Sequence, residues 1–183
     1  MNIGTTISFI IAGLILLAIL NVNTSLMTDS GTATLDQSAK EQVDAVASVL
    51  SNDMRKIGYR VNVSSDTAIV SASQHSITFK GDWNNDGSVD RITWTFDTSK
   101  PVTSTDNPND YELTRTVNGV STVLNMGVTQ FNITLYDNSG NVVASPILAK
   151  RIKVSMICET PESYNGHYSP ASWQKIFTPV NIN

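Results

Sequence analysis

The sequence predicts an α+β protein in which one long N-terminal helix packs on an antiparallel β-sheet. The first observation is an uncharged apolar run at the N-terminus, followed by a second stretch in which apolar residues recur at helical spacing. The second is a change to alternating apolar and polar residues from Arg60 onward, interrupted by turn-forming residues. We expect three parts: an apolar helix over residues 1–28, an amphipathic helix extension over 29–60, and an antiparallel β globular domain over 61–183.

The apolar run from Ile3 to Leu26 is long enough to cross a bilayer. It holds no Asp, Glu, Lys or Arg, and its most apolar part is Ile7–Leu20. A helix needs roughly 20 mostly apolar residues to cross the ~30 Å hydrocarbon layer. A buried core helix is the alternative, but the rest of the chain has no second long apolar helix to pack against it. We therefore expect a transmembrane helix.

This run is expected to be a retained anchor and not a cleaved signal peptide. A secretory signal has a positively charged start and a small-residue cleavage site of the Ala-x-Ala type. The first six residues, MNIGTT, carry no positive side chain, and the NVNTS that follows the apolar core has no such cleavage pattern.

Composition and charge narrow the function classes. The formal net charge is −4 and the isoelectric point is about 5.0, without a basic patch, so nucleic acid is not an expected partner. The one cysteine, Cys158, excludes an intramolecular disulfide and is expected to be a buried apolar residue. We find no nucleophile–base pair, Gly-x-Ser-x-Gly elbow or phosphate loop, so no enzymatic activity is expected. An anchored hydrolase of unusual type is the weakest alternative.

The second helical stretch follows a small polar segment, Thr28–Thr34. Gly31 in its middle predicts a break or a softened turn in the helix. Helical spacing then resumes, with Asp53 among the polar positions and Gly58 as the C-cap. Whether this helix continues the anchor helix stays open. The expected apolar stripe, which should cover a sheet, is Leu35, Ala39, Val43, Val46, Ala47, Leu50, Met54 and Ile57.

The β region is expected to be an antiparallel meander with one covered face. Asn118-Gly119 between two alternating runs is the strongest hairpin signal. Two polar stretches, Thr98–Asp110 and Thr160–Trp173, are expected to be irregular loops that face partners. The expected strands are 68–71, 76–80, 91–97, 111–117, 120–125, 128–137, 142–143, 151–159 and, as an edge strand, 174–182.

The sharpest local motif lies between the second and third expected strands. Its sequence, DWNNDGSVD, places oxygen-bearing side chains at the first, third, fifth and ninth positions and glycine at the sixth, like the front of an EF-hand loop. The twelfth position is Thr93 and not Glu, and the flanks are strands, so a helix-loop-helix is excluded. A calcium-binding β-hairpin loop and an Asx-rich hairpin loop without metal are the alternatives. The candidate ligands are Asp82, Asn84, Asp86, the backbone carbonyl of Ser88, and Asp90.

Taken together, these motifs resemble the type IV pilin superfamily, most of all the minor pilins and the J-type pseudopilins of type II secretion. Asn52–Tyr59 (NDMRKIGY) is similar to the DLRxAGY end of the long helix in those families. Ser76–Phe96 resembles their hairpin with a DxDGDGxxD-like loop. Leu113–Gly119 (LTRTVNG), followed by Val128–Gly140 (VTQFNITLYDNSG), resembles their L-x-R-x-x-x-G and V-x-x-F-x-x-x-Y-D-x-x-G run. The resemblance covers nearly the whole chain.

The resemblance implies a non-enzymatic subunit of a type IV pilus or a type II secretion-like filament. Its partners would be other pilin-like subunits and the inner membrane, and it would occur in the cell envelope or in an extracellular filament. The alternative is a singly anchored envelope binding module that binds calcium and never assembles. In the filament reading, residues 1–28 form the filament core, and the assembly residues are Ile7, Phe9, Ile10, Ile11, Leu14 and Leu17.

One position departs from the family pattern. The family has Glu at the fifth mature position, where it is thought to pair with a neighbour's amino terminus. Here Thr5 stands at that place if Met1 is retained, and Phe9 if Gly4 is the cleavage point. Members at a filament tip can lack that Glu, so the departure fits a minor subunit.

Overall fold

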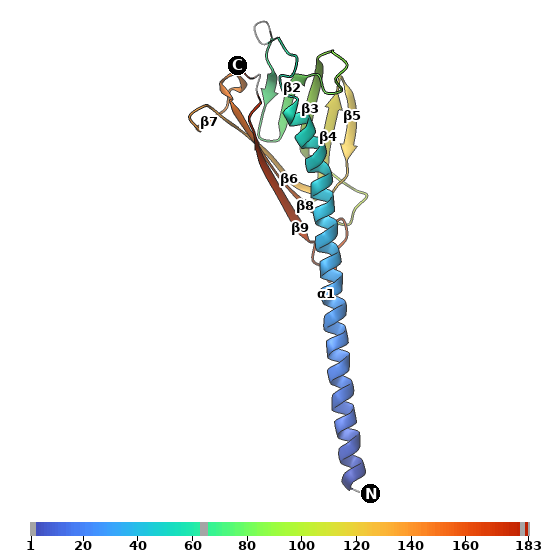
Figure 1. Ribbon diagram of the computed structural model, residues 1–183. Coiled ribbons are helices and arrows are strands. Elements are labelled where there is room, and N and C mark those ends of the chain that lie inside the picture. Colours follow the sequence, from blue (N-terminus) through green and yellow to red (C-terminus); the bar gives the residue numbers. More distant parts are fainter. Residues whose placement is uncertain (1–2, 63–65, 180–181, 183) are drawn as a thin grey trace.

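The structure, a computed structural model, describes residues 3–62, 66–179 and 182. Within these described residues it contains one long helix, α1 (Ile3–Arg55), nine strands and a short 3-10 helix, η1 (Pro146–Leu148) (Figure 1). The predicted α+β class is confirmed. The strands are β1 (Ile69–Ala72), β2 (Ser76–Gly81), β3 (Asp90–Pro101), β4 (Tyr111–Val117), β5 (Val120–Leu124), β6 (Val128–Tyr136), β7 (Val142–Val143), β8 (Arg151–Glu159) and β9 (Pro170–Phe177).

Helix α1 is continuous, so the anchor and its amphipathic extension form a single element. The predicted break near Gly31 is wrong, because α1 runs through Thr28–Thr34 without interruption. Hydroxyl groups inside a helix can bond the carbonyl four residues earlier, which makes polar residues compatible with helix here. Three such bonds occur in this stretch: Thr28 to Thr24 (3.1 Å), Thr32 to Thr28 (3.2 Å) and Thr34 to Ser30 (2.9 Å).

The strands form two antiparallel sheets and not the single meander predicted. β1 to β5 follow one another in a five-stranded sheet, and the second sheet has the order β7-β6-β8-β9. The chain changes sheet at Gly127, whose φ is +64° and whose added Cβ would lie 2.0 Å from the carbonyl oxygen of Glu159. Only glycine fits a backbone that comes this close to the end of β8.

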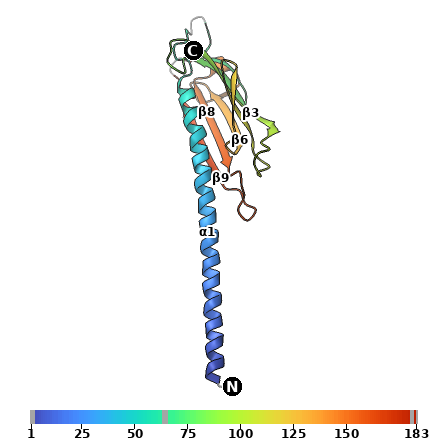
Figure 2. The ribbon, with the colours of Figure 1, turned by 90° about the vertical axis from the view of Figure 1, so that its right-hand side faces the viewer.

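One hydrophobic core joins α1 to both sheets. The helix lies along one side of the sheets (Figure 2), and its apolar stripe is buried from Ala39 to Met54, with Leu50 fully buried. The predicted inward faces of three strands are confirmed. They are Ile92, Trp94 and Phe96 in β3, Phe131, Ile133 and Leu135 in β6, and Ile152, Val154, Met156 and Cys158 in β8.

Some strand limits differ from the prediction. β3 extends to Pro101, because Tyr111 of β4 pairs with Pro101 beyond a register shift. The last strand begins at Pro170 and ends at Phe177, whereas residues 174–182 were predicted; residues 180 and 181 lie outside the described part. Its whole length pairs with β8, from Ile152–Phe177 to Glu159–Pro170. The order of parts, a long N-terminal apolar helix packed on antiparallel sheets, is a pilin-like architecture.

Candidate functional site

The N-terminal half of α1 extends beyond the rest of the chain (Figure 1). It is the part of the described chain that is long and apolar enough to cross a membrane, and none of its most apolar 18-residue window is buried. The predicted assembly residues all lie here, and each is at least half exposed: Ile7 (50%), Phe9 (80%), Ile10 (57%), Ile11 (52%), Leu14 (61%) and Leu17 (59%). An apolar surface of this extent needs lipid or other protein to cover it.

The other end of α1 is held to the five-stranded sheet by an ion pair. Asp53 is 1% exposed and accepts two hydrogen bonds from Arg115 of β4, from Nε to Oδ2 at 2.6 Å and from Nη2 to Oδ1 at 2.9 Å. Trp94 of β3 donates its Nε1–H to Oδ2 at 2.9 Å. The Arg115 guanidinium also lies over the Trp83 ring, 5.0 Å from its centroid. The helix end and two strands therefore meet at a single carboxylate, and the loop that holds Trp83 contacts the guanidinium bound to it.

Sequence reasoning missed this arrangement because it placed Asp53 among the polar positions outside the apolar stripe of the helix. The signal was present in the motifs. Asp53 is the acidic residue of NDMRKIGY, and Arg115 is the basic residue of LTRTVNG. The structure brings these two motifs together, 62 residues apart in the chain.

The predicted calcium ligands occupy one hairpin loop between β2 and β3. Asp82 and Asp90 are buried at its base, whereas Asn84, Asp86 and Ser88 are exposed at its tip. Asp82 accepts backbone N–H bonds from Asp86 (Oδ1, 3.1 Å) and Gly87 (Oδ2, 3.0 Å). The loop turns through two residues with left-handed backbone, Asn85 (φ 63°) and Gly87 (φ 96°). These residue types accept that conformation at little cost.

The two buried carboxylates of this loop each have a side-chain partner. Arg60 lies beside Asp82, with Nε 3.4 Å from Oδ2. Asp90 accepts a hydrogen bond from Asn118 of the β4–β5 turn, from Nδ2 to Oδ1 at 2.6 Å. The Asp86 carboxylate accepts hydrogen bonds from the Ser88 N–H and from the Asn84 side chain, and these bonds lower the pKa of the Asp86 carboxyl.

The loop geometry allows both predicted alternatives. No three His, Cys, Asp or Glu side chains of residues 3–62, 66–179 and 182 are grouped closely enough to hold a metal ion. The proposed ligand set also contains amide and backbone oxygens, so calcium binding stays a prediction. The backbone N–H groups of Asp86 and Gly87 donate to the Asp82 carboxylate, which is the bonding pattern of an Asx-rich turn.

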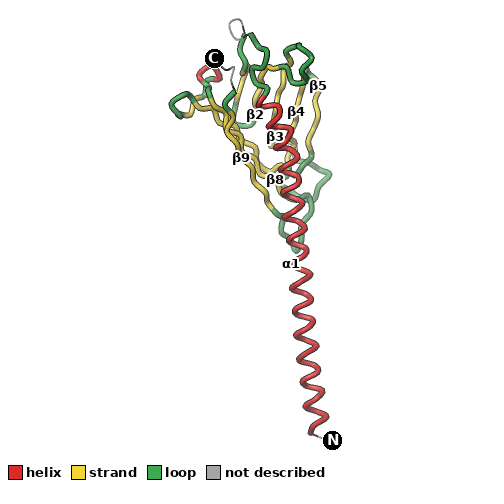
Figure 3. The backbone as a smooth tube through the Cα atoms, in the orientation of Figure 1, coloured by secondary structure: helices red, strands yellow, loops and turns green. Residues whose placement is uncertain are grey.

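Two loops lie at the end of the β domain nearest the apolar half of α1 (Figure 3). We call them the base loops, residues 102–110 and 160–169. The second was predicted to be irregular and to face partners, but it contains a tight hairpin with paired backbone bonds between Tyr164 and His167 (3.0 Å each). Asn165 (φ 51°) and Gly166 (φ 79°) form its turn. Asn-Gly is a strong hairpin signal that sequence reasoning passed over here.

This hairpin packs on α1 at Gly31, the residue predicted to break the helix. A Cβ added at Gly31 would lie 2.7 Å from Cζ of the Tyr164 ring. The Tyr164 hydroxyl donates to the carbonyl oxygen of Met27 at 3.5 Å, and the Ser169 hydroxyl bonds the Asp36 carboxylate. The glycine therefore admits an aromatic ring against the helix and does not interrupt it.

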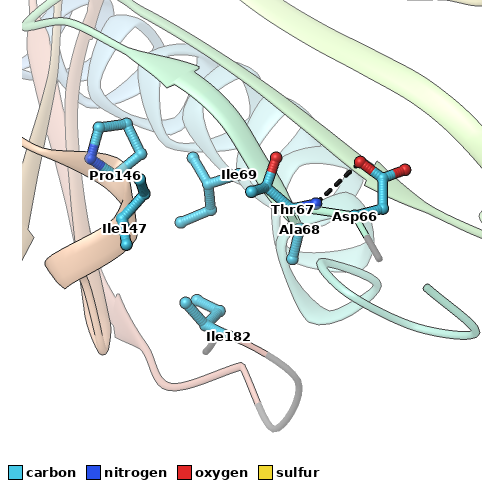
Figure 4. Close-up of a pocket in the computed structure, with 7 residues that line it drawn as sticks. All are labelled: Asp66, Thr67, Ala68, Ile69, Pro146, Ile147 and Ile182. Atoms are coloured by element: carbon cyan, nitrogen blue, oxygen red, sulfur yellow. Dashed lines mark hydrogen bonds between the residues drawn. The ribbon is translucent and has the colours of Figure 1, made fainter. Parts of the chain in front are cut away.

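A cavity of about 250 Å³ lies between the start of β1 and η1, away from the base loops (Figure 4). Its one acidic lining residue, Asp66, accepts bonds from Lys80 Nζ (2.6 Å to Oδ1) and from the Thr67 N–H (2.8 Å), which lower the pKa of its carboxyl. The other lining residues are Thr67, Ala68, Ile69, Pro146, Ile147 and Ile182. Among the described lining residues there is no paired nucleophile and base.

Cys158 is fully buried on β8, as predicted. Burial raises the pKa of its thiol to about 12, with Asp110 contributing in the same direction. A thiol with so high a pKa is almost entirely protonated at neutral pH and is a poor nucleophile.

Neither a family model nor a curated protein matches this chain.

Proposed function

We propose that this chain is a non-enzymatic, pilin-like subunit of a type IV pilus or a type II secretion-like filament, and that it assembles through the apolar half of α1. The observation that carries the proposal is the exposure of that half: Phe9 is 80% exposed and Leu14 61% exposed on a helix with no cover from its own domain. Burying one large aliphatic or aromatic side chain contributes about 1.5–3 kcal/mol. Several such residues on one helix make an uncovered state in water unfavourable.

Two environments can cover this surface, and a filament subunit uses both in turn. Before assembly the helix lies in the inner membrane, where lipid covers it. After assembly the same residues pack against the helices of neighbouring subunits. Because lipid is as apolar as a neighbouring helix, removal from the bilayer needs work from other components of the machine.

The length of α1 and its attachment to the sheets at the C-terminal end suit this mechanical role. At 1.5 Å per residue, a 53-residue helix is about 80 Å long. The helix is joined to the sheets through the buried stripe and through the Asp53–Arg115 pair. A pull on the helix is therefore transmitted to the domain, which would be displayed on the filament surface.

The test is negative-stain microscopy of material sheared from cells that express the chain, labelled with gold through an antibody to residues 66–179. We expect gold on thin filaments, along them for a main subunit or at one end for a minor subunit. Cells that lack the chain are the control. Label restricted to membrane fragments would contradict the proposal.

A second candidate function is a singly anchored envelope module that binds calcium through the β2–β3 loop. The observation that favours it is the convergence of Asp82 and Asp90 at the base of that loop below the exposed Asp86. The first candidate requires assembly through α1, and the second does not. Gold on membranes alone, together with calcium-dependent stability of the chain, would favour the second.

A further inference from the structure

The Tyr164–His167 hairpin of the second base loop contacts α1 near Met27 and Gly31. Its Tyr164 hydroxyl bonds the carbonyl of Met27 (3.5 Å), and its ring covers Gly31. The uncharged apolar run of the helix ends at Leu26, and the first charged residue is Asp29. The hairpin is therefore placed beside the last apolar turn of the membrane-spanning segment.

The hairpin lies at the level of the polar headgroup layer for each of two positions of the helix in a bilayer. A hydrocarbon core of ~30 Å takes about 20 residues, and the polar layer on each side adds roughly 5–7 Å. If the core holds Ile7–Leu26, Met27 lies at its edge. If the core holds Ile3–Val22, Met27 lies about 7.5 Å beyond the edge at 1.5 Å per residue, at the outer limit of the polar layer.

The hairpin also has the chemistry of that layer. Tyrosine is enriched at membrane–water interfaces because its ring is apolar and its hydroxyl is polar. Ser163, Asn165 and His167 are exposed beside Tyr164 and can exchange hydrogen bonds with headgroups. Residues 160–169 contain Glu162 but no Lys or Arg. A surface of this charge suits zwitterionic lipid better than anionic lipid.

The hairpin is held firmly enough to set the height of the domain. The Tyr168 hydroxyl donates to the carbonyl of Asp106 at 2.7 Å, and the Asp106 N–H donates to the carbonyl of Pro161 at 3.1 Å. The Ser169–Asp36 bond fixes the loop to the helix a second time. Hydrogen bonds therefore connect both base loops to each other and the second base loop to α1.

We propose that the Tyr164–His167 hairpin is a membrane-surface contact, which binds the zwitterionic headgroup layer and sets the height of the β domain above the bilayer. The inference rests on the membrane-anchoring part of the proposed function and not on filament assembly. Before extraction into a filament, these headgroup contacts would have to be broken together with the helix–lipid contacts.

The experiment uses the full chain in phosphatidylcholine vesicles with a fluorophore at an introduced cysteine, Ser163→Cys in the hairpin or Ser139→Cys as the matched control. Both serines are exposed. The control lies in the β6–β7 turn, at the opposite end of β8 from the hairpin, because Tyr136 pairs with Arg151 and Val128 with Cys158. The buried native thiol, with its pKa raised to about 12, does not compete for the label near neutral pH.

A nitroxide on the lipid headgroup should quench the Ser163→Cys label several-fold more than the Ser139→Cys label. Adding Tyr164→Ala should reduce that quenching, and adding anionic lipid should not increase it. Equal quenching of the two labels would overturn the inference.

A third label, Ala18→Cys in the apolar run, separates failure of membrane anchoring from failure of the hairpin contact. Quenching of this label by a nitroxide on the acyl chain shows that α1 is inserted. If it is quenched and the hairpin label is not, the hairpin inference alone is wrong. If it is not quenched, anchoring fails and the inference fails with it.

Discussion

Asp53 of α1 and Arg115 of β4 form a two-point ion pair between the helix and the five-stranded sheet, with N–O distances of 2.6 and 2.9 Å. The carboxylate is 1% exposed, and Trp94 donates a third hydrogen bond to it. A buried carboxylate is tolerated only when its oxygens are satisfied by donors or cations. The pair therefore specifies where the end of α1 rests on the sheet.

Replacing one partner of this pair should destabilise the domain strongly. Arg115→Met leaves the Asp53 carboxylate buried with Trp94 as its remaining donor among these partners, and such a change typically costs about 3–5 kcal/mol. Urea unfolding of the full chain in detergent, followed by tryptophan fluorescence, measures it. The exposed Arg91→Met is the matched control. Adding Asp53→Leu to Arg115→Met should recover part of the loss; purely additive losses would contradict a direct pair.

Most of the fold could be predicted from the sequence because apolar residues recur in it with clear helical or alternating spacing. Alternation located all of the strand segments from Ile69 to Val143, and turn chemistry located the Asn118-Gly119 hairpin. It could not show two sheets, because the partner of β6 depends on long-range packing: β6 pairs with β8 and not with β5. The alternation is the same in either arrangement.

The errors along α1 have a common cause. Gly31 and Asp53 were interpreted from local sequence alone, Gly31 as a break or a softened turn and Asp53 as a polar position outside the apolar stripe. Each is instead explained by a residue more than 60 positions away in the chain, Tyr164 for Gly31 and Arg115 for Asp53. Tertiary contacts outweigh local propensity at both positions.

Leu50 should be a highly sensitive position of the apolar stripe of α1. It is fully buried, and Leu→Ala at such sites costs about 2–5 kcal/mol. Leu50→Asp should prevent folding of the domain. The neighbouring Val49 is 40% exposed, so Val49→Ala and Val49→Asp are the controls and should change the unfolding midpoint little. An unchanged melting curve for Leu50→Asp would contradict the packing of helix on sheet.

Asp110 should make the stability of the domain depend on pH. Burial raises the pKa of its carboxyl, although a hydrogen bond from the Thr105 hydroxyl (3.1 Å to Oδ2) acts in the opposite direction. The folded state thus binds this proton more tightly than the unfolded state. The contribution to stability is complete below the ordinary pKa of 3.8 and is lost as the pH rises through the folded-state pKa.

Asp110→Asn removes this titrating group. The stability of the variant relative to the natural chain should therefore increase as the pH rises above 3.8. Thermal melts at several pH values measure the difference. Asp137→Asn is the control of opposite sign, because Asn141 bonds the Asp137 carboxylate and lowers its pKa. That stabilisation is present above the ordinary pKa and lost as the pH falls through the folded-state value. A pH-independent difference for Asp110→Asn would contradict the assignment.

Calcium should raise the melting temperature of the full chain if the β2–β3 loop binds it. Extracellular calcium sites typically have Kd values of about 10⁻⁴–10⁻³ M, and calcium at ten times Kd would stabilise the folded state by about 1.4 kcal/mol. Asp86→Asn should remove most of this effect, because it removes the exposed carboxylate at the loop tip. The exposed Asp44→Asn on α1 is the control. A melting temperature that does not change with calcium, together with no heat of binding by calorimetry, would contradict calcium binding. The loop would then be an Asx-rich turn formed by the bonds from the Asp86 and Gly87 N–H groups to Asp82.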